Sequence, residues 1–385
     1  MSNPFEITIK LKQHSPLIHF QHDQPGATLR ATELKPKLDR FIIRKCFDGI
    51  FNRYKESLVE FDKKIYDSLK AKEKEEFEKN IHKALAYKMT SMAKLRFKKS
   101  YKMIADQKQG VELSDIEIKI FSYNPQLLKI IQGDIKSFFV LTNFGTRQSK
   151  GFGCFTTTDT TKDEFEQIAQ EEFGYIYKKK KKRYAIEEIL EEYQLLKSGK
   201  NYKGYEKSKF FTYMCDKHNI TWEKRKIKET LRADHPGVFD SLMYDQRAGF
   251  NRVEACVKPE TELEYRYIRA LLGLAEHNEY RTERGNKLNL EKVTINIGDP
   301  RKEISRFQSP ILFKIFQDTI YIFPKKIPAI MFDRTFAFEL EKHYRNGKKD
   351  KETLFPLNTP REDEFDMKEF LDTSLLPGWE RKPSP

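Results

Sequence analysis

Residues 135–153 read IKSFFVLTNFGTRQSKGFG, and this stretch carries more information about the fold than any other part of the chain. Residues 135–144 are apolar enough for a buried helix, whereas Cys154–Thr158 has the composition of a strand. The segment between them contains three glycines, Gly145, Gly151 and Gly153. We therefore expect a helix, a glycine-rich loop and a strand in succession.

The glycine-rich loop, defined here as Asn143–Gly153, also contains two cations, Arg147 and Lys150. Glycines allow backbone N–H groups to face outward and let a phosphate come close, because no Cβ stands in the way. The cations are suited to neutralising such phosphates. The alternative is an ordinary turn with solvated charges. The spacing matches neither the Walker loop nor the dinucleotide fingerprint, so we expect no nucleotide cofactor and no other cofactor.

Toward the N-terminus, residues 5–11 (FEITIKL) alternate apolar and polar side chains, which predicts a half-buried strand. The Pro-containing segment His14–Arg30 is expected to be a loop. From Leu34 onward the apolar spacing becomes helical, and residues 116–121 (IEIKIF) predict a further strand. The polar face of this first helix is basic, with Lys35, Lys37, Arg40, Arg44 and Lys45.

Residues 54–83 are rich in Lys and Glu and predict a charged helical insertion. The composition shifts near residue 165, after which come a basic run, an amphipathic helix and three short strands; these are residues 178–183, 186–196, 293–297, 311–316 and 320–323. From about residue 348 the chain is polar and contains Pro. The expected organisation is thus an N-terminal domain over 1–165, a second α+β domain over 166–347 and a polar tail over 348–385.

The composition restricts the class of protein. Of 385 residues, 72 are Lys or Arg and 58 are Asp or Glu, so the formal net charge is 72 − 58 = +14, which favours an anionic partner such as nucleic acid. Aromatic residues make up 13%, too many for a disordered polyelectrolyte. The four cysteines form no CxxC pair, which argues against a zinc ribbon. No apolar run approaches 18 residues, so we expect a cytoplasmic location and no membrane partner.

Several of these segments resemble the RAMP superfamily of CRISPR systems. The resemblance rests on the turn His14–Leu17, on Leu29–Lys35 leading into a helix, on Phe144–Gly153, and on Arg306–Leu312 before a strand. Within the superfamily the chain is most similar to the subunit that caps the 3′-guide end of the type III-B Cmr complex. That subunit usually has paired glycines where this chain has Gly145 alone, and the insertion after residue 52 is long for it.

The resemblance implies an α+β fold of two ferredoxin-like (RRM-like) domains with helical insertions. It also implies guide RNA, target RNA and other RAMP subunits of a type III complex as partners, and a role in antiviral defence. We therefore predict a non-catalytic RNA-binding subunit. The residues predicted to bind RNA are Arg30, Lys35, Arg40, Gly145, Arg147, Lys150 and Gly151. A general RNA-binding protein outside CRISPR is an alternative.

The histidines His14, His19 and His22 suggest two other roles. They could ligate a metal, but no cysteine or carboxylate cluster accompanies them, so we predict no metal site. One of them could be the general acid or base of a metal-independent endonuclease acting on CRISPR repeat RNA, since other RAMPs cut that RNA with a His near the first helix. That enzyme is the main alternative; we predict no catalytic residue.

Overall fold

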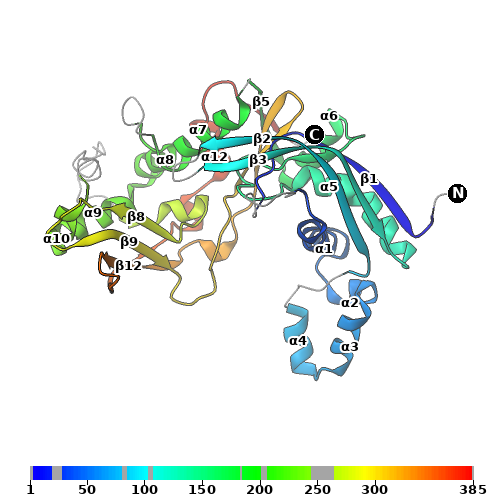
Figure 1. The fold of residues 1–385 in the computed structure, drawn as a ribbon, viewed down its shortest axis with the longest axis horizontal. Coiled ribbons are helices and arrows are strands. Elements are labelled where there is room, and N and C mark those ends of the chain that lie inside the picture. The colour runs from blue at the N-terminus through cyan, green and yellow to red at the C-terminus, as the bar shows by residue number, and fades with distance from the viewer. Residues whose placement is uncertain are drawn as a thin grey trace. The chain divides into compact units, whose positions relative to one another are not determined.

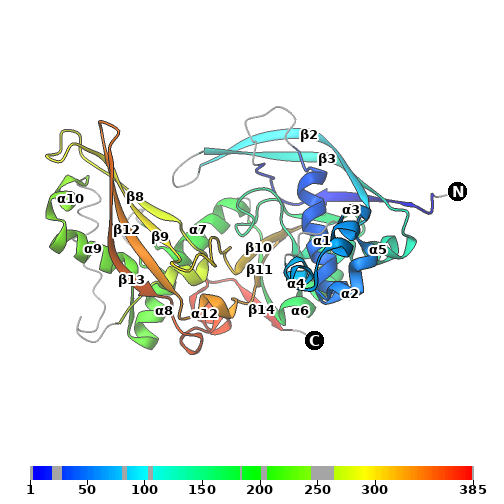
Figure 2. The same cartoon turned by 90° about the horizontal axis from the view of Figure 1, so that it is seen from below.

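A computed structural model describes residues 3–19, 28–79, 85–102, 107–182, 184–200, 206–243 and 264–383. The chain forms two compact units (Figures 1 and 2). Unit 1 comprises Met1–Ile189, Leu312–Phe323 and Glu380–Pro385, and unit 2 comprises Leu190–Ile311 and Pro324–Trp379. Both units combine helices with antiparallel sheets, so the prediction of a mixed fold of helices and sheets is confirmed.

The first sheet of unit 1 has the strand order β2-β3-β1-β4, and all its neighbours are antiparallel. Its strands are β1 (Glu6–Gln13), β2 (Lys88–Lys102), β3 (Gln107–Phe121) and β4 (Phe155–Thr157). The alternation predicted for residues 5–11 places Ile9 and Leu11 of β1 in the core. Along the chain the elements follow the order β1, α1, β2, β3, α5, β4, with short helices between α1 and β2.

Two long helices, α1 (Ala31–Phe47) and α5 (Pro125–Leu141), share one hydrophobic core with this sheet. The α1 helix begins before the first residue of the apolar pattern, so Pro36 lies beyond its first turn. The α5 helix begins where the Asn124 side chain accepts hydrogen bonds from two backbone N–H groups. At its other end the Lys314 ammonium donates to two backbone carbonyls at 2.9 Å, which satisfies groups that a helix terminus leaves unpaired.

The predicted charged insertion consists of short helices, namely α2 (Phe51–Tyr54), η1 (Lys55–Ser57), α3 (Glu60–Ser68) and α4 (Ala71–Lys79). They are held together by aromatic side chains at their inner faces. The Phe51 ring lies 5.3 Å from that of Tyr54 and 4.5 Å from that of Tyr66, and the Tyr66 ring lies 5.7 Å from that of Phe77. The charged insertion therefore contains a small cluster of aromatic side chains in addition to its Lys and Glu residues.

The second sheet of unit 1 has the order β10-β11-β5-β14. Its strands are β5 (Tyr175–Lys180), β10 (Ile311–Phe316), β11 (Thr319–Pro324) and β14 (Glu380–Pro383), and β5 follows helix α6 (Lys162–Phe173). Most of the basic run 178–183 thus lies in or beside a strand within a sheet. Lys178 and Lys179 form ion pairs with Glu166 and Glu188, at 3.6 and 2.7 Å, and Arg183 lies outside the described residues.

Unit 2 contains a four-stranded antiparallel sheet of order β13-β12-β9-β8 and a parallel pair, β6 and β7. The sheet strands are β8 (His277–Arg281), β9 (Leu290–Gly298), β12 (Thr335–Tyr344) and β13 (Lys349–Asn358), and the pair is β6 (Ile220–Trp222) with β7 (Glu264–Arg266). The helices are α7 (Ala185–Lys197, which begins in unit 1), α8 (Lys209–His218), α9 (Glu223–Asp234), α10 (Pro236–Ser241), α12 (Met367–Ser374), η3 (Ile268–Leu272), η4 (Ala329–Met331) and η5 (Glu362–Glu364). None of the described helices combines the length and apolar character that a bilayer crossing needs.

The segment predicted to be a polar tail is regular structure instead. It forms β13, α12 and β14, and α12 buries Phe370 against Phe210 at a ring distance of 5.1 Å. The sequence conceals β13 because it is an edge strand that exposes most of its Lys and Glu side chains to solvent. The predicted domain boundaries near residues 165 and 347 stay predictions, because the compact units do not establish which segments fold independently.

Candidate nucleic-acid interface

The glycine-rich loop is closed on itself by hydrogen bonds. The backbone N–H of Phe144 donates to the carbonyl of Gly153 at 3.0 Å. The buried Asn143 side chain donates to the carbonyls of Gln148, at 2.6 Å, and of Phe313 in β10, at 3.0 Å. These bonds fix the conformation of the loop in the protein alone. A ligand that bound there would therefore not pay the entropy cost of ordering the loop.

The glycines of the loop have positive φ and face protein rather than solvent. A Cβ on Gly145 would lie 2.4 Å from the carbonyl oxygen of Ile18, and one on Gly151 would lie 2.8 Å from the Cδ1 atom of Ile189. Both positions therefore require glycine for the turn and for close packing. That either glycine also lets a phosphate approach stays a prediction.

Arg147 and Lys150 occupy one tight turn within the loop. The backbone N–H of Lys150 donates to the carbonyl of Arg147 at 2.9 Å, and the turn is joined to β10 because the N–H of Phe313 donates to the carbonyl of Ser149 at 3.1 Å. Burial, with the positive charge of Arg147 as the smaller cause, lowers the pKa of Lys150 to about 8. Two half-buried cations are thus held close together on a rigid turn.

The first helix contacts the loop through a pair that the sequence analysis did not select. The Lys37 ammonium donates to Glu33 at 2.9 Å and to the carbonyl of Asn143 at 3.1 Å, and Glu33 accepts a hydrogen bond from the N–H of Gly145 at 2.6 Å. Desolvation lowers the pKa of Lys37, although Glu33 opposes that change. The i,i+4 spacing of Glu33 and Lys37 is a signal that could have indicated an ion pair.

The other predicted cations of this region differ in their surroundings. Lys35 donates to Asp39 at 2.9 Å and to the carbonyl of Leu85 at 3.0 Å, so its charge is already matched by protein groups. Arg40 is exposed, and within the described part of the chain no acidic side chain pairs with it. Arg30 is half-buried at the start of α1, and its charge helps to lower the pKa of the buried His19, after burial itself. The RNA-binding roles of Arg30, Lys35 and Arg40 therefore all stay predictions, and the ammonium of Lys35 also holds α1 to the backbone at Leu85.

Two family models match the chain. The model described as the Cmr1 N-terminal domain matches residues 5–200, and the model described as the Cmr1 C-terminal domain matches residues 205–376. The chain belongs to the Cmr1 family. The sequence-based assignment to a type III-B RAMP subunit is thereby confirmed, and membership of the Cmr1 family implies a subunit of the Cmr complex in CRISPR defence.

Among solved structures, the crystal structure of apo Cmr1 from Pyrococcus furiosus is similar to this Cmr1-family chain. The match has 10% sequence identity and a TM-score of 0.37, and it covers 98% of each chain. No curated protein matches.

In this Cmr1-family chain His14 is half-buried and His19 is buried. His14 shares hydrogen bonds with Thr156, at 2.8 Å, and with the backbone N–H of Gln317, at 3.4 Å. Burial, together with the nearby lysines, lowers its pKa to about 3. The ring is therefore neutral, and its Nδ1 accepts while its Nε2 donates. His22 lies outside the described residues.

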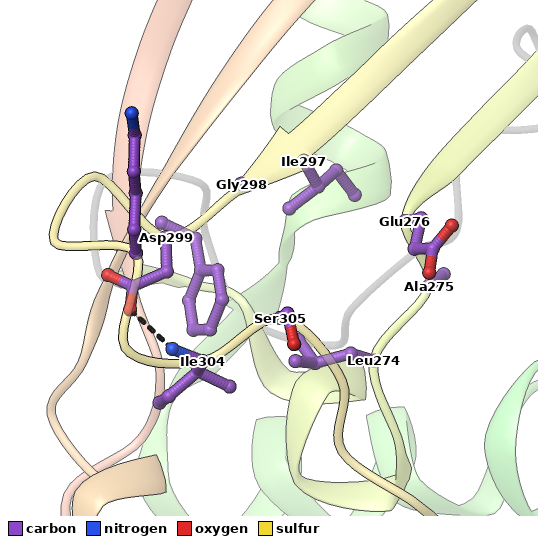
Figure 3. Close-up of a pocket in the computed structure, with 10 residues that line it drawn as sticks. Leu274, Ala275, Glu276, Ile297, Gly298, Asp299, Ile304 and Ser305 are labelled. Carbon is purple, nitrogen blue, oxygen red and sulfur yellow. Dashed lines mark hydrogen bonds between the residues drawn. The ribbon is translucent and has the colours of Figure 1, made fainter.

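Unit 2 of the Cmr1-family chain contains a cavity of about 220 Å³ beside the end of β9 (Figure 3). One of its walls contains Asp299, whose carboxylate accepts hydrogen bonds from the Arg334 guanidinium and from the backbone N–H groups of Arg301, Glu303 and Ile304. Asp299 therefore organises the 299–304 turn and has little capacity left for a ligand. The described residues contain no group of three or more potential metal ligands.

Proposed function

We propose that the chain is a non-catalytic, RNA-binding subunit of a cytoplasmic type III-B Cmr complex, and that Arg147 and Lys150 bind phosphates of guide or target RNA. The complex would supply its other partners, the neighbouring RAMP subunits. The observation that carries the proposal is the pair of adjacent cations on a rigid, half-buried turn.

A half-buried lysine beside an arginine is electrostatically unfavourable in the protein alone, as the lowered pKa of Lys150 indicates. Proteins retain such unfavourable arrangements chiefly at functional sites. An anion placed between the two side chains would relieve their repulsion, and a phosphodiester offers two oxygens for charge-assisted hydrogen bonds. The formal net charge of +14 adds a long-range attraction for RNA.

Salt dependence of binding to single-stranded RNA tests this proposal. The logarithm of the association constant should fall linearly with the logarithm of salt concentration, by about 0.7 for each phosphate neutralised. Arg147→Ala and Lys150→Ala should each lower that slope by about one contact. Lys64→Ala removes an exposed lysine of α3 as a matched control and should leave the slope unchanged. A salt-independent affinity would contradict the proposal.

The non-catalytic part of the proposal is tested by incubating the purified protein with repeat RNA in EDTA. We expect no cleavage, because a His with the environment of His14 is poorly matched to proton transfer near neutral pH. If one site were cut, and if the triple variant His14→Ala, His19→Ala, His22→Ala stopped the cutting without loss of RNA binding, the endonuclease alternative would replace this proposal.

We further propose that the ferredoxin-like interpretation applies to the first sheet of unit 1. Two features support it: the succession β1, α1, β2, β3, α5, β4, and the fully antiparallel order β2-β3-β1-β4. A crystal structure of the protein would test both features directly.

A further inference from the structure

Strand β2 exposes an unusual combination of side chains. It is the edge strand of the first sheet of unit 1 and runs beside β3 (Figure 2). Three large apolar side chains on it are exposed, Met92 by 54%, Leu95 by 44% and Phe97 by 54%. The strand also contains six cations and no acid; the cations are Lys88, Lys94, Arg96, Lys98, Lys99 and Lys102. Cations are enough to keep an edge strand solvated, so solvation of the edge does not explain why these three apolar side chains are exposed.

The charge of β2 is only partly matched by neighbours. Lys94 pairs with Asp115 at 3.0 Å, and Lys99 pairs with Glu187 at 3.1 Å. Arg96 and Lys98, on either side of Phe97, are exposed, and among the described residues neither has an acidic partner. Along the sequence, an exposed aromatic residue thus stands between two exposed cations.

The backbone of β2 is poorly suited to pairing with a further strand. Its register with β3 shifts twice, between Met92 and Lys94 and again between Leu95 and Phe97. Bulges and lysines are the features by which natural edge strands avoid pairing with other chains. An aromatic ring between cations is, in contrast, the usual platform for single-stranded nucleic acid, since the ring stacks on a base and the cations neutralise phosphates.

The end of β2 is attached to the glycine-rich loop. The Tyr101 ring lies 5.4 Å from the ring of Phe152, edge to face. In the neighbouring strand β3, the backbone of Val111, which lies opposite Lys98 of β2, exchanges two hydrogen bonds with that of Leu17, at 2.8 and 3.0 Å. Phe97 is four residues from Tyr101, which is about 13 Å along a strand. This is the length of about two extended nucleotides, so β2 leads directly away from the loop of Arg147 and Lys150.

We propose that β2 is a second RNA-binding segment, in which the Phe97 ring stacks on a base and Arg96 and Lys98 contact the adjoining phosphates. The inference rests on the proposed function and extends it, because it assigns single-stranded RNA to a strand outside the glycine-rich loop.

The test measures affinity for a fluorescein-labelled dodecauridylate by fluorescence anisotropy. Phe97→Ala should raise Kd at least about fivefold, the lower end of what base–aromatic stacking contributes. Arg96→Ala and Lys98→Ala should each lower the salt slope by about 0.7. Tyr123→Ala is the matched control. Tyr123 is an exposed aromatic residue (82%) that follows the last residue of β3, Phe121, whereas Tyr101 of β2 lies beside the first residues of β3. This variant should leave both quantities unchanged.

A direct readout of stacking comes from Phe97→Trp, whose added tryptophan fluorescence should be quenched when RNA binds, whereas that of Tyr123→Trp should not. If Phe97→Ala binds RNA like the wild type while Arg147→Ala and Lys150→Ala weaken binding, the inference is wrong and the proposed function stands. If none of these variants changes binding, both are wrong. If Phe97→Ala abolishes self-association in light scattering without affecting RNA, β2 pairs with a protein strand and the inference is overturned.

Discussion

The affinity for RNA should depend on pH through Lys150. Burial and the neighbouring Arg147 lower the pKa of this side chain to about 8, and only its protonated form attracts phosphate. About nine tenths of Lys150 is protonated at pH 7 and about one tenth at pH 9 in the free protein. If a bound phosphate requires the ammonium, Kd should rise about tenfold between these two pH values.

The assay is an anisotropy titration at constant ionic strength, with an RNA composed of adenosine and cytidine, whose bases do not lose protons in this range. Lys150→Arg is the control, because a guanidinium stays charged at every pH used and should make Kd independent of pH. Lys150→Ala should also be independent of pH but weaker throughout. A wild-type Kd that is the same at pH 7 and pH 9 would refute the assignment of Lys150 to a phosphate.

Three further predictions concern stability. Gly153→Ala should destabilise the protein by about 3 kcal/mol or more in urea unfolding, since its Cβ would lie 2.0 Å from a backbone oxygen; Gly174→Ala, also at positive φ but with open space around it, should cost only about 1 kcal/mol. Lys150→Met should raise the free energy of unfolding at pH 7 by about 1–2 kcal/mol while weakening RNA binding, because it removes a desolvated cation whose pKa is lowered; equal or lower stability would contradict the burial argument. Burial opposes ionisation of Asp299, but hydrogen bonds from Arg334 and backbone N–H groups lower its pKa to about 2. The stability this carboxylate contributes should be complete above pH 4 and lost toward pH 2, and Asp299→Ala should lower the melting temperature at pH 7 and remove that part of the acid dependence.

The sequence predicts those elements whose apolar side chains are buried, either on one face or along the whole strand. The alternation of residues 5–11 corresponds to β1, the apolar face beginning at Leu34 to α1, and residues 311–316 and 320–323 to β10 and β11. The β2 strand is not predicted from the sequence, because most of its length is exposed and an exposed strand has no apolar alternation. The same reasoning explains why β13 was mistaken for a tail.

The candidate site was only partly predictable from sequence. The spacing of Arg147 and Lys150 between glycines indicates a cationic turn, and the structure contains that turn. Lys35 donates a hydrogen bond to the carbonyl of Leu85, which lies 50 positions later in the chain. Local sequence patterns do not reveal such a contact. The packing of Gly151 against Ile189 could not be predicted for the same reason, because tertiary packing brings these two distant residues together.

The second sheet of unit 1 also has a consequence for biosynthesis. Its strands β10, β11 and β14 follow residue 310 in the sequence, yet they complete the unit to which the N-terminal residues belong. One of the two carbonyls that accept from the Asn143 side chain lies 170 positions after it, and Lys314 donates to a carbonyl near the end of α5 that precedes it by 175 positions. A ribosome releases the N-terminal segment first, so the contacts of α5 and the glycine-rich loop with β10 form only after that strand has been synthesised. The match to the Cmr1 N-terminal domain ends at residue 200. We nevertheless expect that this part of the chain completes its folding only after residue 383 has been translated.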